Sequence, residues 1–134
     1  MKKVGIFIKN SSSIFSNGCI QQSYFLLKTL RKTGRNVDFI CIEDDYKKYE
    51  LINEPVINVK NRDVLNNYNI IIFSSLIVTT PSIVSNFKML GIKIINQIVG
   101  NYYFLNSEEF VFGLHSGLTQ TLCNDYIDET WLMP

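Results

Sequence analysis

Polar side chains that could bind a ligand gather in three segments of the sequence, at residues 10–18, 74–80 and 100–103. The first segment runs from Asn10 to Gly18, is rich in hydroxyl and amide groups, and leads into a helical pattern. Free backbone N–H groups at a helix N-terminus favour an anion such as a phosphate. The chain has neither a G-x-G-x-x-G nor a G-x-x-x-x-G-K-[ST] motif, so it lacks the dinucleotide and P-loop signatures. An ordinary polar connection with Ser16 or Asn17 as the helix N-cap is the alternative.

Cys19 and His115 are the residues best suited to nucleophilic chemistry. Cys19 lies in the first turn of the predicted helix, where the helix dipole lowers the pKa of a thiol. His115, the only histidine, lies in a predicted loop and could serve as a general base, because an imidazole titrates near neutral pH. Together they could form a Cys–His pair, although the sequence identifies no third residue to orient them. A small semi-buried thiol and a hydrogen-bonded surface histidine are the alternatives.

Aromatic and acidic residues supply further candidates. Tyr102 and Tyr103 could stack on a sugar or base ring, or pack under their own loop. The adjacent carboxylates at positions 44–45 and 108–109 do not predict paired-carboxylate catalysis, because neighbours in sequence point apart in helices and strands. The catalytic residue is therefore left open, with His115 and Glu108 as the two candidates.

The elements that must position these groups alternate between buried strands and amphipathic helices. Short apolar runs predict strands at Val4–Ile8, Val37–Ile42, Val56–Val59, Ile70–Phe73, Ile92–Val99 and Thr130–Met133. Helical spacing predicts helices at Cys19–Lys32 and Pro81–Leu90, a single turn near Asp63–Asn67, and short helices at Glu108–Phe112 and within Glu43–Glu54. Gly34 and Gly91 are placed to end the two longer helices.

This alternation predicts an α/β fold, an open, mostly parallel Rossmann-like sheet with helices on both faces. Residues 1–134 show no internal repeat or linker, so we expect a single domain. In such sheets ligands bind beyond the carboxyl ends of the strands, near the point where the strand order reverses. That rule selects the three polar segments named above as the candidate site.

Composition excludes several classes of function. Of the 134 residues 46% are hydrophobic and 19% charged, which is enough apolar material for a core and argues against disorder. Lys plus Arg number 13 and Asp plus Glu 12, for a net charge of +1, so the chain lacks the basic surplus of a nucleic-acid-binding protein.

The cysteines and apolar runs predict a compartment. Cys19, Cys41 and Cys123 match neither a disulfide framework nor a zinc pattern, and we expect no metal and no cofactor. The apolar run after Lys3 is too short for a signal peptide, and no run approaches the roughly twenty apolar residues of a membrane span. We therefore expect a cytoplasmic location.

Three sequence blocks resemble one family. The first is Asn17-Gly18-x-x-Gln21 at the start of the first helix, with Phe25-Leu26-Leu27 behind it. The second is Gly100-Asn101-x-Tyr103, followed by Glu108 and Phe112. The third is Tyr126-x-Asp128-Glu129-x-Trp131-x-x-Pro134. In this order they are similar to an uncharacterised, largely bacterial family that is catalogued as a domain of unknown function and grouped with GT-B-fold glycosyltransferases.

This resemblance implies the acceptor-side, N-terminal domain of an enzyme that transfers a glycosyl group from a nucleotide sugar. It implies that the cleft is lined by residues from two loops, namely Asn17, Gly18, Gln21, Gly100, Asn101, Tyr103 and Glu108. The polar segments selected above add Asn10, Ser11 and Tyr102 as candidate binding residues. The implied partners are a sugar acceptor and a nucleotide-sugar donor. The family's pattern continues into a second domain, whereas this chain ends at Pro134, so we expect a separate Rossmann-like donor domain or self-association.

Two other functions stay open on the sequence alone. A flavodoxin-like module also holds a flavin phosphate at the loop after its first strand, and Tyr102, Tyr103 or Trp131 could flank the ring. A non-catalytic interaction domain would instead use an exposed apolar patch.

Overall fold

A computed structural model of the protein describes residues 2–8, 18–42, 54–74, 81–98 and 126–132. Its strands are β1 (Lys3–Phe7), β2 (Val37–Cys41), β3 (Val56–Asn58), β4 (Tyr68–Ser74), β5 (Lys93–Ile98) and β6 (Glu129–Leu132). Its helices are α1 (Gly18–Lys32), α2 (Arg62–Leu65) and α3 (Pro81–Met89). Each agrees within a residue or two with a predicted element. The helices expected within 43–54 and 108–112 lie largely or wholly outside the described residues.

Within these ranges the strands form one open sheet in the order β3-β2-β1-β4-β5-β6, and every neighbouring pair is parallel. This is the strand order of a doubly wound, Rossmann-like fold, and it confirms the predicted fold class. The chain leaves β1 in one direction to build β2 and β3, and later returns to add β4 on the other side. The order therefore reverses between β1 and β4.

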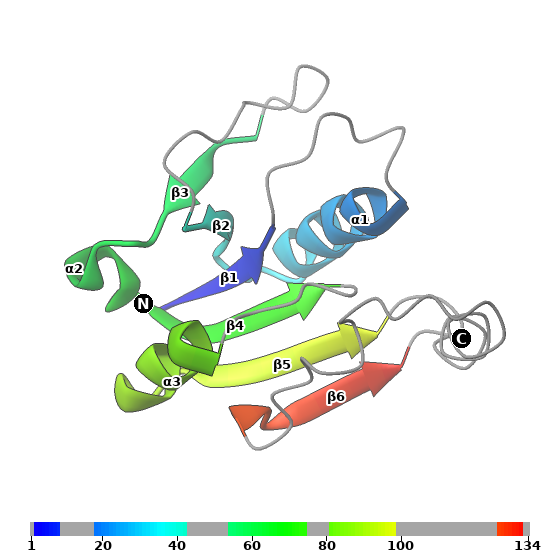
Figure 1. Ribbon diagram of the computed structural model, residues 1–134. Coiled ribbons are helices and arrows are strands. Elements are labelled where there is room, and N and C mark those ends of the chain that lie inside the picture. The colour runs from blue at the N-terminus through cyan, green and yellow to red at the C-terminus, as the bar shows by residue number, and fades with distance from the viewer. Residues whose placement is uncertain (1, 9–17, 43–53, 75–80, 99–125, 133–134) are drawn as a thin grey trace, which may run out of the picture.

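Alternation along the strands creates two apolar layers, one on each face of the sheet. One layer joins β1, β2 and β4 to α1 through residues such as Ile6, Phe39 and Leu27. The other joins the same strands to α2 and α3 through Ile71, Leu65 and Phe87. Helices thus cover both faces, as Figure 1 shows.

Glycines end the two longer helices as predicted. Gly34 and Gly91 have φ angles of 81° and 69°, which a residue with a side chain rarely adopts. After α1, the amide of Arg35 donates to the Leu30 carbonyl at 3.1 Å. After α3, the amide of Ile92 donates in the same way to Phe87, also at 3.1 Å. Both ends are Schellman motifs, which turn the chain back into the sheet.

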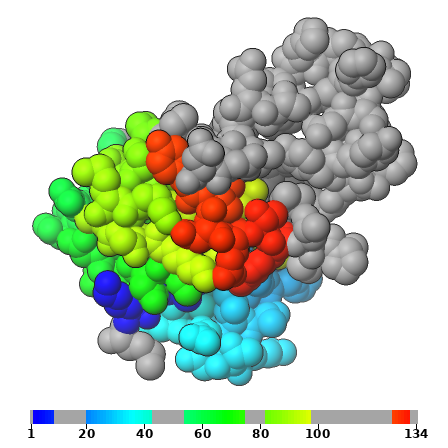
Figure 2. Space-filling model, turned by 90° about the horizontal axis from the view of Figure 1, so that it is seen from below, coloured from blue at the N-terminus to red at the C-terminus, as the bar shows by residue number. Residues whose placement is uncertain are grey.

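The third sequence block forms the edge of the sheet beside α3. The carboxylate of Asp128 accepts the Ile94 amide at 2.7 Å and two hydrogen bonds from the Lys88 ammonium. The hydrogen bond from Ile94, followed by that from Lys88, lowers the pKa of Asp128. In Figure 2 the red atoms of β6 lie at the surface between those of α3 and those of the α1–β2 region. Asp128 thereby fastens β6 to both β5 and α3.

At the centre of the sheet the side chain of Ile40 lies very close to the backbone of Gly5. Gly5 lies in β1 between β2 and β4, opposite Asp38 and Ile71. A Cβ atom at Gly5 would lie only 2.6 Å from the Cδ1 atom of Ile40. The absence of a side chain at position 5 therefore lets Ile40 fill the space above β1.

We expect Gly5→Ala to lower the free energy of unfolding by about 1–3 kcal/mol, because it overpacks the sheet. Ile40→Val removes the clashing Cδ1 atom and alone should cost about 0.5–1.5 kcal/mol. Urea unfolding of the single and double variants measures the coupling between the two sites. The loss of unfolding free energy in the double variant should be clearly smaller than the sum of the losses in the two single variants. Strict additivity would contradict this packing.

A buried carboxylate ties β3 to α1. Glu54, which is 9% exposed, accepts hydrogen bonds from Lys28 at 2.8 Å and from Arg31 at 2.6 Å. Arg31 also donates twice to the Val37 carbonyl at the start of β2. Burial raises the pKa of the Glu54 carboxyl, but the hydrogen bonds from Lys28 and Arg31 outweigh it and lower the pKa overall. The ionised form of Glu54 therefore stabilises the fold.

Glu54→Gln should lower the free energy of unfolding at pH 7 by about 1–3 kcal/mol, because one charged partner of a largely buried pair is lost. The folded-state pKa lies below the ordinary value of 4.5, so this stabilisation is present above pH 4.5 and disappears as the pH falls through the folded pKa. Urea titrations at pH 7 and pH 3 should show the difference between wild type and variant shrinking in acid.

Glu129→Gln is the matched control, since Glu129 pairs with Lys93 and both side chains are over two-fifths exposed. It should change the free energy of unfolding far less than Glu54→Gln. Equal effects of the two substitutions would contradict the role assigned to Glu54.

Candidate functional site

The carboxyl ends of β1, β4 and β5 lie side by side, because these three strands are parallel neighbours. Each of them leads directly into one of the three polar segments selected from the sequence. The edge spans the reversal between β1 and β4, where ligands of open α/β sheets bind. The structure therefore places side by side the three strands that precede the polar segments of the predicted site.

Ser74 and Gln97 form a buried polar pair at this edge. The two are register partners at the ends of β4 and β5, and they are 1% and 3% exposed. The Ser74 hydroxyl donates to Oε1 of Gln97 at 2.9 Å. Both follow apolar residues of the α1-side layer by two positions, so the pair lies on the α1 face of the sheet. The hydrogen bond fixes the carboxamide, and no described residue accepts from its N–H groups.

Asn96 adds a second carboxamide on the opposite face. It is 9% exposed and lies beside Phe73 of β4, one position before Gln97. Among the described residues no hydrogen-bond partner contacts its side chain. Buried carboxamides normally have a partner, so within the described part of the chain Asn96 has unused hydrogen-bonding capacity. The end of β5 therefore carries amide groups on both faces.

The start of α1 lies at the same edge. α1 begins at Gly18, and Gln21 in its first turns is half-buried. α1 returns from the carboxyl end of β1 and packs on β2 and β4, so its N-terminus lies at the carboxyl edge, on the face of Ser74 and Gln97. Helix N–H groups and neutral amide and hydroxyl side chains thus converge there, a set that suits hydroxyl and phosphate oxygens.

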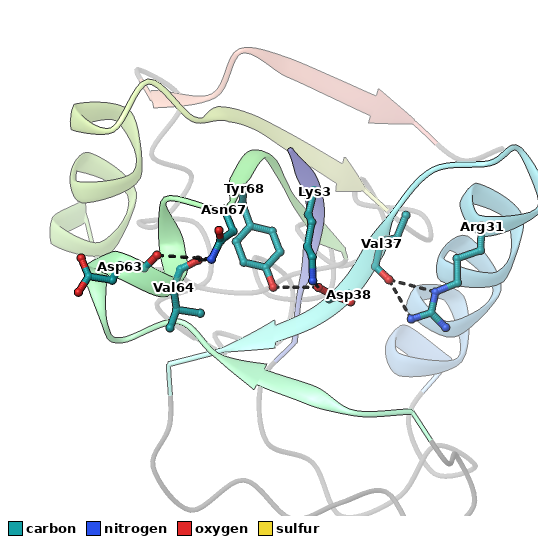
Figure 3. A network of polar contacts seen from close by, with 8 residues as sticks. All are labelled: Lys3, Arg31, Val37, Asp38, Asp63, Val64, Asn67 and Tyr68. Carbon is teal, nitrogen blue, oxygen red and sulfur yellow. Dashed lines mark hydrogen bonds and ion pairs between the residues drawn. The ribbon is translucent and has the colours of Figure 1, made fainter. Parts of the chain in front are cut away.

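Charged networks lie elsewhere in the described structure. At the amino edge of the sheet, the Asp38 carboxylate accepts from Lys3 at 2.9 Å and from the Tyr68 hydroxyl at 3.0 Å (Figure 3). Burial, followed by the negative charge of Asp38, raises the pKa of Tyr68 above its ordinary range. This network closes the starts of β1, β2 and β4, so its role is structural.

Most of the predicted site residues fall outside the described residues. Gly18 is described as the first residue of α1, and Gln21 as a half-buried residue in the same helix. The predicted residues outside the description are Asn10, Ser11, Asn17, Gly100, Asn101, Tyr102, Tyr103, Glu108 and His115. The side chain of Cys19 is likewise outside it, so the Cys–His pair stays a prediction.

Asn96 and Gln97 are the site residues that the sequence reasoning missed. Both lie within the predicted strand Ile92–Val99, and the prediction selects only the segment that follows this strand. The available signal was the Asn-Gln pair near the end of that strand, because consecutive polar residues in a buried parallel strand have to be hydrogen-bonded. Ser74, by contrast, was included at the start of the second polar segment.

The third sequence block is a structural feature as far as it is described. Asp128 fastens β6, Glu129 pairs with Lys93, and the Trp131 indole donates to Glu129 at 3.1 Å. Trp131 also packs on the α1-side layer. These contacts give the block a role in holding the edge of the sheet.

Residues 4–134 match the family described as "Protein of unknown function (DUF2827)". The chain belongs to this family. No curated protein and no solved structure matches the chain. The match agrees with the predicted membership of a family of unknown function. In the ranges that the structure describes, no helix is long and apolar enough to cross a membrane, and no group of three or more acidic, histidine or cysteine side chains could hold a metal ion.

Ser74→Ala should lower the free energy of unfolding by about 1–3 kcal/mol, because it leaves the buried Oε1 atom of Gln97 without its donor. Ser85→Ala is the matched control, since the Ser85 hydroxyl donates to the Ser82 carbonyl at an exposed position. Thermal and urea unfolding of both variants measure the difference. A loss at Ser74 no larger than that at Ser85 would contradict the buried pair.

Proposed function

We propose that this DUF2827 domain is the acceptor-side, Rossmann-like domain of a glycosyltransferase that uses a nucleotide-sugar donor. The observation that carries the proposal is the buried Ser74–Gln97 pair at the carboxyl edge where the strand order reverses. Sugars present many neutral hydroxyl groups, and fixed carboxamides both donate to and accept from hydroxyls. The three sequence blocks that resemble the GT-B-grouped family support the same proposal.

In this proposal residues from three parts of the carboxyl edge bind the substrates. Gln97, held by Ser74, offers its N–H groups to an acceptor hydroxyl on the α1 face. Asn10, Ser11, Asn17, Gly18 and Gln21 line the cleft from the first loop and helix, and Gly100, Asn101, Tyr102, Tyr103 and Glu108 line it from the loop after β5. Transfer then requires a donor-binding domain that faces this edge, because both substrates must be held together.

The strand order favours this proposal over a flavodoxin-like module. A flavodoxin-like sheet has the order 2-1-3-4-5, in which the third strand in sequence lies beside the first. Here β3 lies outside β2, and β4 is the neighbour of β1. The order is that of the Rossmann-like group, to which the domains of GT-B proteins are related.

Saturation-transfer NMR with methyl glycosides of glucose, galactose, mannose and N-acetylglucosamine tests the proposal. At least one glycoside should bind, and Gln97→Leu should weaken its binding about tenfold, because a buried amide contact is lost. Asn69→Leu is the matched control, since Asn69 is an exposed amide near the amino end of β4. If Gln97→Leu does not fold, Gln21→Ala provides the second variant, at a half-buried position, with a smaller expected loss.

Flavin mononucleotide is the comparison ligand. Binding of the flavin with no glycoside bound would contradict the proposal and favour the flavodoxin-like alternative. Binding of a glycoside that is unchanged in both the Gln97 and Gln21 variants would place the sugar elsewhere and also contradict it.

A further inference from the structure

A groove lies between α2 and α3, on the face of the sheet opposite α1. Its volume is about 420 Å³, which falls in the range of small-molecule pockets. The residues that line it are Ile42, Val59, Lys60, Arg62, Leu65, Ile83, Asn86, Phe87, Met89 and Leu90. None of the residues of the carboxyl-edge site is among them.

The groove follows from the shortness of α2. This helix has only four residues, so it covers little of the apolar face next to α3. Ile83, Phe87 and Leu90 recur at helical spacing, and this stripe of α3 forms one wall. Val59 and Leu65 form the opposite wall, and both are buried beneath the connection that leads through α2. Met89 is 75% exposed at the groove.

Arg62 lines the groove on the side of α2. It is exposed, and no carboxylate is among the described residues that line the groove. Asn86 on α3 adds a neutral amide. Apolar walls with a guanidinium at the rim complement a molecule that has an apolar body and one anionic end.

We propose that this groove binds a small aliphatic carboxylate. The apolar chain lies along the stripe of α3, and the carboxylate pairs with Arg62, whose planar guanidinium matches a carboxylate with two parallel hydrogen bonds. This site shares no residue with the site at the ends of β1, β4 and β5, and it does not depend on the glycosyltransferase proposal.

Methyl NMR of methionine-labelled protein tests the site, with decanoate as the probe and Met89→Leu to assign the Met89 signal. Decanoate should shift the Met89 methyl signal saturably. Arg62→Gln should weaken decanoate binding about three- to tenfold, because a rim charge is lost, and should leave the binding of decanol unchanged.

Arg35→Gln is the matched control, because Arg35 is an exposed arginine just after α1 and is not part of the groove. It should leave decanoate binding unchanged. Three results would overturn the proposal: no saturable shift at Met89, equal affinity of wild type and Arg62→Gln for decanoate, or binding of decyltrimethylammonium as tight as that of decanoate.

Discussion

The placement of β1 between β2 and β4 is the constraint on which the rest of the structure depends. β1 is hydrogen-bonded to a strand on each side and buried on both faces, so it tolerates few amino-acid substitutions. Gly5 leaves room for Ile40, which packs in the apolar layer on the α3 side of the sheet. Because β1 and β4 are adjacent, their loops leave the same edge, and the reversal of strand order creates the place where a ligand can bind.

The two ends of this sheet serve different purposes. At the amino end, Asp38 gathers Lys3 and Tyr68 in a closed ionic and hydrogen-bonded network. At the carboxyl end the buried polar groups that the structure describes are neutral, and no described residue accepts from the N–H groups of Gln97. A buried group with unused donors stabilises the fold less than a fully bonded one, so such a group suits a binding role better than a structural one. The distribution of polar groups therefore favours the carboxyl edge as the functional one.

Much of the fold could be predicted from the sequence because buried residues form regular apolar patterns along the chain. Runs such as Ile70–Phe73 marked buried parallel strands, and Gly34 and Gly91 marked helix ends whose φ angles the structure confirms. The pairing of Ser74 with Gln97 could not be predicted, since it depends on the register of β4 against β5, which single-strand patterns do not contain. The third block resembled a family motif, but only the structure assigns Asp128 to fastening the sheet edge. The groove could not be predicted either, because it forms where the one-turn helix α2 leaves the apolar face next to α3 uncovered.

The central claim is that ligands bind at the carboxyl edge of β1, β4 and β5. An amide chemical-shift map of the full chain, recorded with the methyl glycoside that binds most tightly, tests it most directly. The account predicts that the largest shifts lie at Ile8, Ser74 and Gln97 and in the first turn of α1. Largest shifts at the amino edge, around Lys3, Asp38 and Tyr68, would contradict it.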